Sequence, residues 1–235
     1  MAAVHADIPA SLLDQAYEEA RLAGLVLSCD ERGYFLSDGV MSVRGDFTRM
    51  LPRISPNALN RELVVKAARI KGVSAPLRVF DATAGLGEDS LLLAAAGHAV
   101  SLCERNPVIA VLLLSALSQA GSDHALADAA CRMSASCSDG VLTLRRLDTA
   151  PDVVLLDPMF PERRKSAAVK KKLQLLQRLE RPCEDEQELL DAAFAAHPCK
   201  VIVKRPVKGP HLAGRKPDYT LSGKAIRFDC YSLPR

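Results

Sequence analysis

The sequence contains no tryptophan, and aromatic residues make up only 4% of its 235 positions. Apolar residues are 49% of the chain, so we expect a core built mainly from leucine, valine and alanine. No apolar run approaches the roughly 20 residues that a membrane-spanning helix needs. The N-terminus lacks a basic stretch followed by an apolar one, so no signal peptide is expected. We therefore predict a cytoplasmic protein with no membrane partner.

Paired cysteines are also missing. The seven cysteines are scattered and odd in number, and no two have the Cys-x-x-Cys spacing of a zinc or redox motif. Reduced thiols that pack as small apolar residues fit this distribution better than a disulfide framework. We expect no bound metal.

The net charge is only +3, but the basic residues are unevenly distributed. Acidic residues predominate before residue 40, whereas arginine and lysine gather in 44–61, 163–172 and 200–227. Clusters of this kind can follow a phosphate backbone. Solvated surface lysines would give the same composition, so position relative to the chemical motifs must decide.

Apolar periodicity divides the chain into two parts. Residues 1–75 predict a small α+β appendage, with a helix over 8–23, a hairpin over 25–36, a strand within 40–47, a loop over 48–60 and a helix over 61–70. Residues 76–235 alternate strands (77–81, 99–103, 130–135, 152–156, 200–203, 225–231) with helices (88–96, 107–120, 138–145, 165–179, 184–196). This alternation predicts an α/β fold with a Rossmann-like, doubly wound, mostly parallel sheet.

A glycine-rich turn follows the first strand of this sheet. Gly85 and Gly87 lie between the strand and a helix, so the backbone can approach a ligand closely. Ser90 replaces the third glycine of a dinucleotide-binding motif, and Glu88 and Asp89 at the helix start would repel a pyrophosphate. These carboxylates, together with Asp81, suit the ammonium or ribose of a methionine-derived sulfonium cofactor. The turn therefore favours S-adenosylmethionine over NAD.

Polar residues also follow the next two strands. Glu104 comes about twenty residues after the glycines, where a carboxylate accepts hydrogen bonds from ribose hydroxyls in nucleoside-binding folds. Ser136, Cys137 and Asp139 follow the third strand, where an adenine ring would lie. These positions extend the predicted cofactor site along one sheet edge.

A second motif, Asp157-Pro158-Met159-Phe160, follows the strand at 152–156. It is similar to the Asp/Asn-Pro-Pro-aromatic corner of methyltransferases that act on exocyclic amines. The Asp157 carboxylate and nearby carbonyls can hold the amine hydrogens, and Phe160 can stack on the base, a contact worth about 1–3 kcal/mol. An ordinary turn would explain Asp157-Pro158 alone, but its combination with the glycine turn favours methyl transfer that depends on positioning.

Basic residues surround this corner. Arg163, Arg164 and Lys165 follow it directly, and Lys170 and Lys171 come about one helical turn later. Lys204 and Arg205 end the next strand, at the same sheet edge. This convergence favours phosphate binding, and we predict that these seven residues contact a polyanionic substrate.

These motifs resemble the bacterial RsmJ family in order and spacing. The matching segments are 81–89, 104–107, 156–161, 165–171, 203–206 and 227–229. The resemblance implies a class I methyltransferase fold that transfers a methyl group from S-adenosylmethionine to the N2 amine of a guanosine in small-subunit (16S) ribosomal RNA. The implied partner is that RNA or the 30S subunit. The resemblance also implies cofactor contacts at Glu88, Asp89, Glu104, Arg105, Ser136, Cys137 and Asp157.

Other functions stay open at this point. A DNA methyltransferase acting on adenine N6 or cytosine N4 uses a similar corner, although Met159 stands at the second proline position. A non-catalytic ribosome-assembly factor could keep the same fold for RNA binding alone. An NAD-dependent dehydrogenase is disfavoured by the missing third glycine and the acidic helix start.

Overall fold

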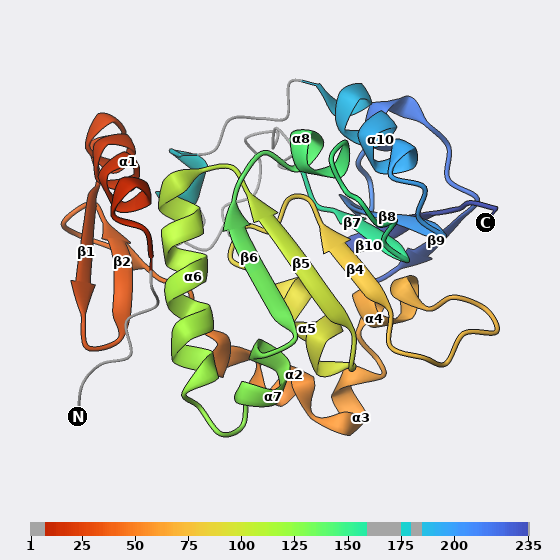
Figure 1. Ribbon diagram of the computed structural model, residues 1–235, viewed down its shortest axis with the longest axis horizontal. Coiled ribbons are helices and arrows are strands. Elements are labelled where there is room, and N and C mark those ends of the chain that lie inside the picture. The colour runs from red at the N-terminus through yellow and green to blue at the C-terminus, as the bar shows by residue number, and fades with distance from the viewer. Residues whose placement is uncertain (1–7, 159–174, 180–184, 235) are drawn as a thin grey trace.

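The computed structural model describes residues 8–158, 175–179 and 185–234. Within these residues, seven strands form one sheet in the order β6-β5-β4-β7-β8-β10-β9 (Figure 1). The parallel strands are β4 (Arg78–Asp81), β5 (Ala99–Glu104), β6 (Met133–Cys137), β7 (Val153–Leu156) and β8 (Lys200–Pro206). At one edge β10 (Ile226–Ser232) pairs antiparallel with β8 and with β9 (Tyr219–Ser222). The predicted doubly wound, mostly parallel sheet is confirmed, and its strand order reverses between β4 and β7.

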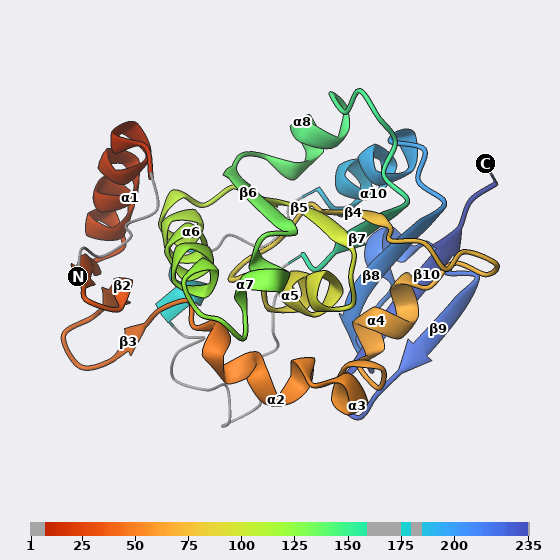
Figure 2. The ribbon, with the colours of Figure 1, turned by 60° about the horizontal axis from the view of Figure 1, so that its bottom comes forward.

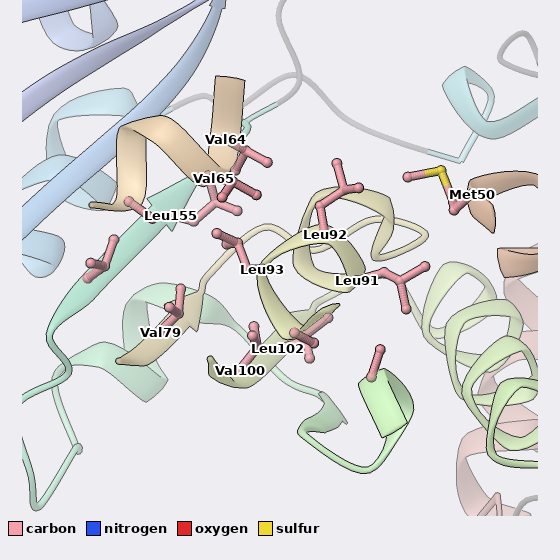
Figure 3. Close-up of a cluster of buried hydrophobic side chains, with 14 of the residues drawn as sticks. Met50, Val64, Val65, Val79, Leu91, Leu92, Leu93, Val100, Leu102 and Leu155 are labelled. Carbon is pink, nitrogen blue, oxygen red and sulfur yellow. The ribbon is translucent and has the colours of Figure 1, made fainter. Parts of the chain in front are cut away.

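Each central strand is buried on both faces and feeds two hydrophobic clusters, because successive side chains of a strand point to opposite sides. Val79 and Leu155 belong to the first cluster, with α4 (Leu63–Ala68) and α5 (Glu88–Ala95) (Figure 3). Phe80 and Val154 belong to the second, with α8 (Gly140–Leu144) and α10 (Glu186–Ala195). Helices thus cover both faces of the sheet, as a Rossmann-like fold requires.

The helix α6 (Pro107–Gly121) is apolar on almost every side because it is covered from two directions. Leu113 and Ala116 pack in the first cluster, whereas Val108 and Leu112 pack in a third. That third cluster includes α1 (Ala10–Leu22) and the separate antiparallel sheet of β1 (Val26–Asp30), β2 (Gly33–Ser37) and β3 (Ser42–Val43). Figure 1 shows this N-terminal unit beside α6. The predicted N-terminal helix and hairpin are present, but the strand expected within 40–47 is only two residues long.

The loop predicted over 48–60 is wrong, since this segment contains η1 (Phe47–Met50), α2 (Leu51–Ile54) and α3 (Pro56–Leu59). Proline favoured a loop, yet Pro52 and Pro56 lie in the first turns of α2 and α3. A missing N–H costs nothing at that position, and the fixed φ suits a helix start. Figure 2 shows these short helices in a row with α4 along one side of the sheet.

Two other boundaries are corrected. The strand expected over 130–135 is β6 at Met133–Cys137, because α7 (Ala127–Ala130) occupies the preceding residues. The helix expected over 61–70 is the shorter α4, and Glu62 rather than Asn60 precedes it. Most of the helix predicted over 165–179 lies outside the described residues, whereas Leu175, Leu176 and Leu179 pack in the third cluster.

The expected domain boundary near residue 75 stays a prediction. Residues on both sides of it share the first cluster, in which Phe47, Met50 and Val64 pack with Leu91 and Leu92. Among the helices that the structure describes, none combines the length and apolar character needed to cross a bilayer.

A buried ion pair on β10 holds the loop that follows β8. Asp229 is fully buried, and Arg227 donates to both of its carboxylate oxygens at 2.8 and 3.1 Å. Arg227 also donates to the carbonyls of Pro206, Val207 and Gly209, so the same guanidinium holds the loop that leaves β8. This pair therefore fixes the chain at the carboxyl end of β8.

We expect Asp229→Ala to lower the free energy of unfolding by about 3–5 kcal/mol, because it leaves the Arg227 charge buried without its carboxylate partner. Urea denaturation at neutral pH measures the change. The control is Asp148→Ala, which removes an exposed carboxylate and should alter stability by less than about 0.5 kcal/mol. Equal stability of the two variants would contradict the assignment.

Candidate active site

The two sequence motifs meet at the carboxyl ends of the adjacent strands β4 and β7. Asp81 pairs with Leu155 in the parallel register, and the amide of Ala82 donates to the carbonyl of Leu155 at 3.1 Å. One step further, the backbone N–H of Asp157 donates to the hydroxyl of Thr83 at 2.6 Å. A side chain of the glycine turn therefore fixes the backbone of the Asp157 corner.

The two glycines of the turn serve different purposes. Both have left-handed backbone, with φ of 54° at Gly85 and 74° at Gly87, which favours glycine. A Cβ at Gly87 would lie 2.7 Å from a methyl group of the buried Leu113, so a larger residue would also have to displace a core side chain. A Cβ at Gly85 would have no heavy atom within 4 Å. The turn is thus packed at Gly87 and open at Gly85, where a ligand can approach the backbone.

Asp81 is buried beneath this turn, with 3% of its surface exposed. Its carboxylate accepts hydrogen bonds from the Ser90 hydroxyl at 2.6 Å and from the Thr83 amide at 3.1 Å. Burial raises the pKa of Asp81 to about 7, although both hydrogen bonds oppose the rise. Because both oxygens are engaged within the protein, Asp81 orders the turn from below.

Glu104 lies beside the same turn at the end of β5. One carboxylate oxygen accepts from the Gly85 amide at 2.9 Å, and the other accepts from the Asn106 amide at 2.8 Å. Burial raises the pKa of Glu104, against the effect of these hydrogen bonds. Each carboxylate oxygen has a second lone pair, so Glu104 retains capacity for ribose hydroxyls. The neighbouring Arg105 is exposed.

The predicted adenine-side residues Ser136 and Cys137 are the last two residues of β6 rather than the residues after it, and Cys137 pairs with Glu104 in the parallel register. The hydroxyls of Ser136 and Ser138 lie 2.9 Å apart, and Cys137 is half-buried. Asp139 caps α8 by accepting from the amide of Leu142 at 3.0 Å. The structure therefore brings Ser136 and Cys137 to the same sheet edge as Glu104.

Lys204 is at the centre of the charged part of the site. Its ammonium nitrogen lies 2.7 Å from a carboxylate oxygen of Asp89 and 2.8 Å from one of Asp157. Burial lowers the pKa of Lys204, but the two carboxylates outweigh that effect and raise it above its ordinary value. One cation thus joins the start of α5, the corner after β7 and the end of β8.

This arrangement corrects the predicted RNA-binding role of Arg205. The side chain of Arg205 is only 1% exposed and lies 3.2 Å from Glu186 of α10. Because neighbouring strand residues point to opposite faces, Lys204 faces Asp89 while Arg205 faces α10. Arg205 is therefore a buried structural cation, and Lys204 is bound to carboxylates within the site.

The remaining predicted site residues differ in how far the structure describes them. Glu88 is exposed in the first turn of α5, and Pro158 is buried next to Asp157. The positions outside the described residues are Phe160, Arg163, Arg164, Lys165, Lys170 and Lys171. Among the residues that are described, no group of three or more histidine, cysteine or acidic side chains is arranged to hold a metal.

Sequence reasoning missed three residues that organise the site. Thr83 binds the Asp157 amide, Ser90 binds Asp81, and Asn106 caps α6 by accepting from the amides of Val108 and Ile109. Thr83 and Ser90 lie within the glycine motif, so their hydroxyls were a usable signal. Asn106-Pro107 is also a recognisable helix start.

Comparison with known proteins identifies the family. The profile of a family of SAM-dependent methyltransferases matches residues 36–233. Ribosomal RNA small subunit methyltransferase J of Thioalkalivibrio sulfidiphilus is 41% identical over 215 residues, which cover 88% of this chain and 84% of the relative. The protein of the same name from Marinobacter nauticus is 37% identical over 225 residues, 93% of this chain and 81% of the relative. The chain belongs to this family of SAM-dependent methyltransferases.

A solved structure agrees with that assignment. The SAM-dependent methyltransferase from Neisseria gonorrhoeae superposes with a TM-score of 0.72 and is 33% identical, covering 89% of this chain and 83% of the other. The family resemblance, the class I methyltransferase fold and S-adenosylmethionine as cofactor are therefore confirmed.

The residues at this edge fit the family's cofactor. Gly85 leaves open space beside the backbone, and Glu104 has lone pairs for a ribose. Asp89 and Asp157 share the single positive charge of Lys204, so the three side chains carry a net charge of −1 when all are ionised. A cationic sulfonium cofactor is favoured by such a site, whereas a pyrophosphate is not.

The pKa of Asp81 predicts a pH-dependent stability. With a pKa of about 7 in the folded state and about 4 in the unfolded state, the folded protein holds the extra proton between these values. The free energy of unfolding should therefore fall as the pH rises from about 4 to about 7, by up to about 1.4 kcal/mol per unit.

Asp81→Asn removes this titration. Urea denaturation at several pH values should show that wild-type protein loses stability relative to Asp81→Asn as the pH rises towards 7. Parallel pH profiles for the two proteins would show that Asp81 does not titrate in this range.

Proposed function

We propose that this protein transfers a methyl group from S-adenosylmethionine to the exocyclic N2 amine of a guanosine in small-subunit (16S) ribosomal RNA. The observation that carries the proposal is the fixed Asp157 corner, which lies on the sheet edge of the family's cofactor site. The relatives named ribosomal RNA small subunit methyltransferase J support the substrate class. The substrate is the RNA itself or the 30S subunit, and the reaction takes place in the cytoplasm.

The chemistry needs accurate placement of a weak nucleophile. The lone pair of an exocyclic amine is delocalised into the ring, so acceptors must hold its hydrogens and direct the lone pair. The Thr83 hydroxyl fixes the backbone of Asp157, and Lys204 holds one oxygen of its carboxylate. A preorganised acceptor of this kind lowers the barrier by orientation, without a strong general base.

The cofactor supplies an electrophilic methyl group when it is bound. We assign its amino-acid end to the turn and the start of α5, its ribose to the end of β5, and its adenine to the end of β6. The assigned residues are Gly85, Gly87, Glu88, Asp89, Glu104, Arg105, Ser136, Cys137 and Asp157. Asp81 contributes by holding the turn in shape.

The described residues support a positioning role for Lys204 instead of a contact with RNA phosphates. Its ammonium already binds two carboxylates, and only 25% of the side chain is exposed. Phosphate contacts are assigned to Arg163, Arg164, Lys165, Lys170 and Lys171, and base stacking to Phe160. Pro158 restricts the backbone of the corner.

The direct test is transfer of labelled methyl groups from S-adenosylmethionine to unmodified small subunits, followed by nucleoside analysis. We expect N2-methylguanosine with wild-type protein, and a rate at least about 100-fold lower with Asp157→Ala, because the amine loses its acceptor. The exposed-site variant Asp148→Ala is the matched control and should keep the wild-type rate.

Urea denaturation establishes that Asp157→Ala is folded. Full activity in that variant would disprove the assigned role of Asp157. Free ribosomal RNA and DNA are tested in parallel, so methylated adenine or cytosine in DNA would favour a DNA methyltransferase. Cofactor binding without transfer to any of these substrates would favour an assembly factor.

A further inference from the structure

A cavity of about 300 Å³ lies next to the ion pairs of the active site. Its walls come from α2, α3, α4, the start of α5 and β10, the region where Figure 2 shows the short helices beside the sheet. The lining residues that matter here are Arg53, Ala58, Arg61, Glu62, Asp89 and Phe228. Only Asp89 is also among the proposed cofactor residues, so the cavity is a separate site that adjoins the first.

The rim of the cavity carries two arginines with different surroundings. Arg53 donates two hydrogen bonds to Glu62, at 2.8 and 2.6 Å, and 43% of its side chain is exposed. Arg61 is exposed and has no ion-pair partner among residues 8–158, 175–179 and 185–234. Arg53 is therefore held in place, while within the described residues no carboxylate pairs with Arg61.

The rest of the lining combines an apolar surface with an acceptor. Leu63 and Ile226 are partly buried and provide the apolar surface, and the buried side chains of Val64 and Phe228 pack behind them in the first hydrophobic cluster. Asp89 provides a carboxylate at one side. A ligand that matches this lining has a negative group, a flat apolar face and hydrogen-bond donors at one edge.

The cavity is also close to the reaction centre. Asp89 lines it and lies 2.7 Å from the Lys204 nitrogen, which is 2.8 Å from Asp157. A ligand that touches Asp89 is therefore separated from the methyl-transfer corner by one shared ammonium group.

We propose that this cavity binds one nucleotide of the RNA substrate. Its phosphate lies against Arg61, because Glu62 already occupies Arg53. Its base lies against the apolar wall, and donors on the base edge face Asp89. Arginine suits phosphate because its guanidinium can donate two parallel hydrogen bonds. The volume is within the range of small-molecule sites. This inference rests on the proposed methyl transfer to RNA and identifies where the RNA enters the site.

The first test is Arg61→Ala, which removes an exposed side chain and leaves the core intact. We expect affinity for unmodified small subunits to weaken by about tenfold, and the slope of log affinity against log salt to decrease by about 1. Affinity for S-adenosylmethionine should not change. The matched control is Arg146→Ala, an exposed arginine after α8, for which the affinity for small subunits should stay within about twofold.

The second test is Ala58→Phe, which fills the cavity from α3. We expect methyl transfer to small subunits to fall by at least about tenfold while affinity for S-adenosylmethionine and the melting temperature remain those of wild type. If Arg61→Ala and Ala58→Phe both match Arg146→Ala while wild type transfers methyl groups, the cavity does not bind the RNA. If wild type transfers no methyl group, the proposed function itself is wrong.

Discussion

The active edge of this protein depends on one ammonium group that is shared by two carboxylates. Lys204 joins Asp89 at the start of α5 to Asp157 after β7, and it does so from the end of β8. Partly buried carboxylates only 2.7 and 2.8 Å from one cation would repel each other strongly without it. The charge of the lysine therefore offsets this repulsion where the three elements meet, and the two carboxylates hold the pKa of Lys204 above its ordinary value.

Hydrogen bonds from the glycine turn and from β5 hold the residues around Lys204 in place at the ends of the strands. Thr83 fixes the backbone of Asp157, and Asp81 fixes Thr83 through its amide. Glu104 holds Gly85 from the side of β5. Each of these polar groups is attached to a strand end whose neighbours are buried aliphatic residues. The hydrophobic clusters on the two sheet faces thus determine where the polar atoms of the site lie.

Much of the fold could be predicted because the central strands are buried on both faces and read as apolar runs. The two strand-end motifs placed Gly85, Glu104 and Asp157 on one edge, which follows from parallel pairing alone. The short helices over 47–59 were missed because proline was taken as a breaker, although it suits a first helical turn. The roles of Lys204 and Arg205 were missed because adjacency in sequence was treated as adjacency in space. Because neighbouring side chains of a strand point to opposite faces, Lys204 contacts Asp89 and Arg205 contacts Glu186.

Residues 47–68, which precede the sheet, contribute more residues to the candidate site than their sequence indicated. The apolar residues of this segment, among them Met50 and Val64, pack with Leu91 and Leu92 on the face of the sheet that includes α5 (Figure 3). Because that packing places α2, α3 and α4 against the start of α5, it also brings Arg53 and Glu62 to the cavity beside Asp89. Asp89 is then common to the charged corner and to the cavity. A substrate group bound there would change the electrostatic environment of Lys204 and hence of Asp157, so binding and orientation of the acceptor are physically coupled at this residue.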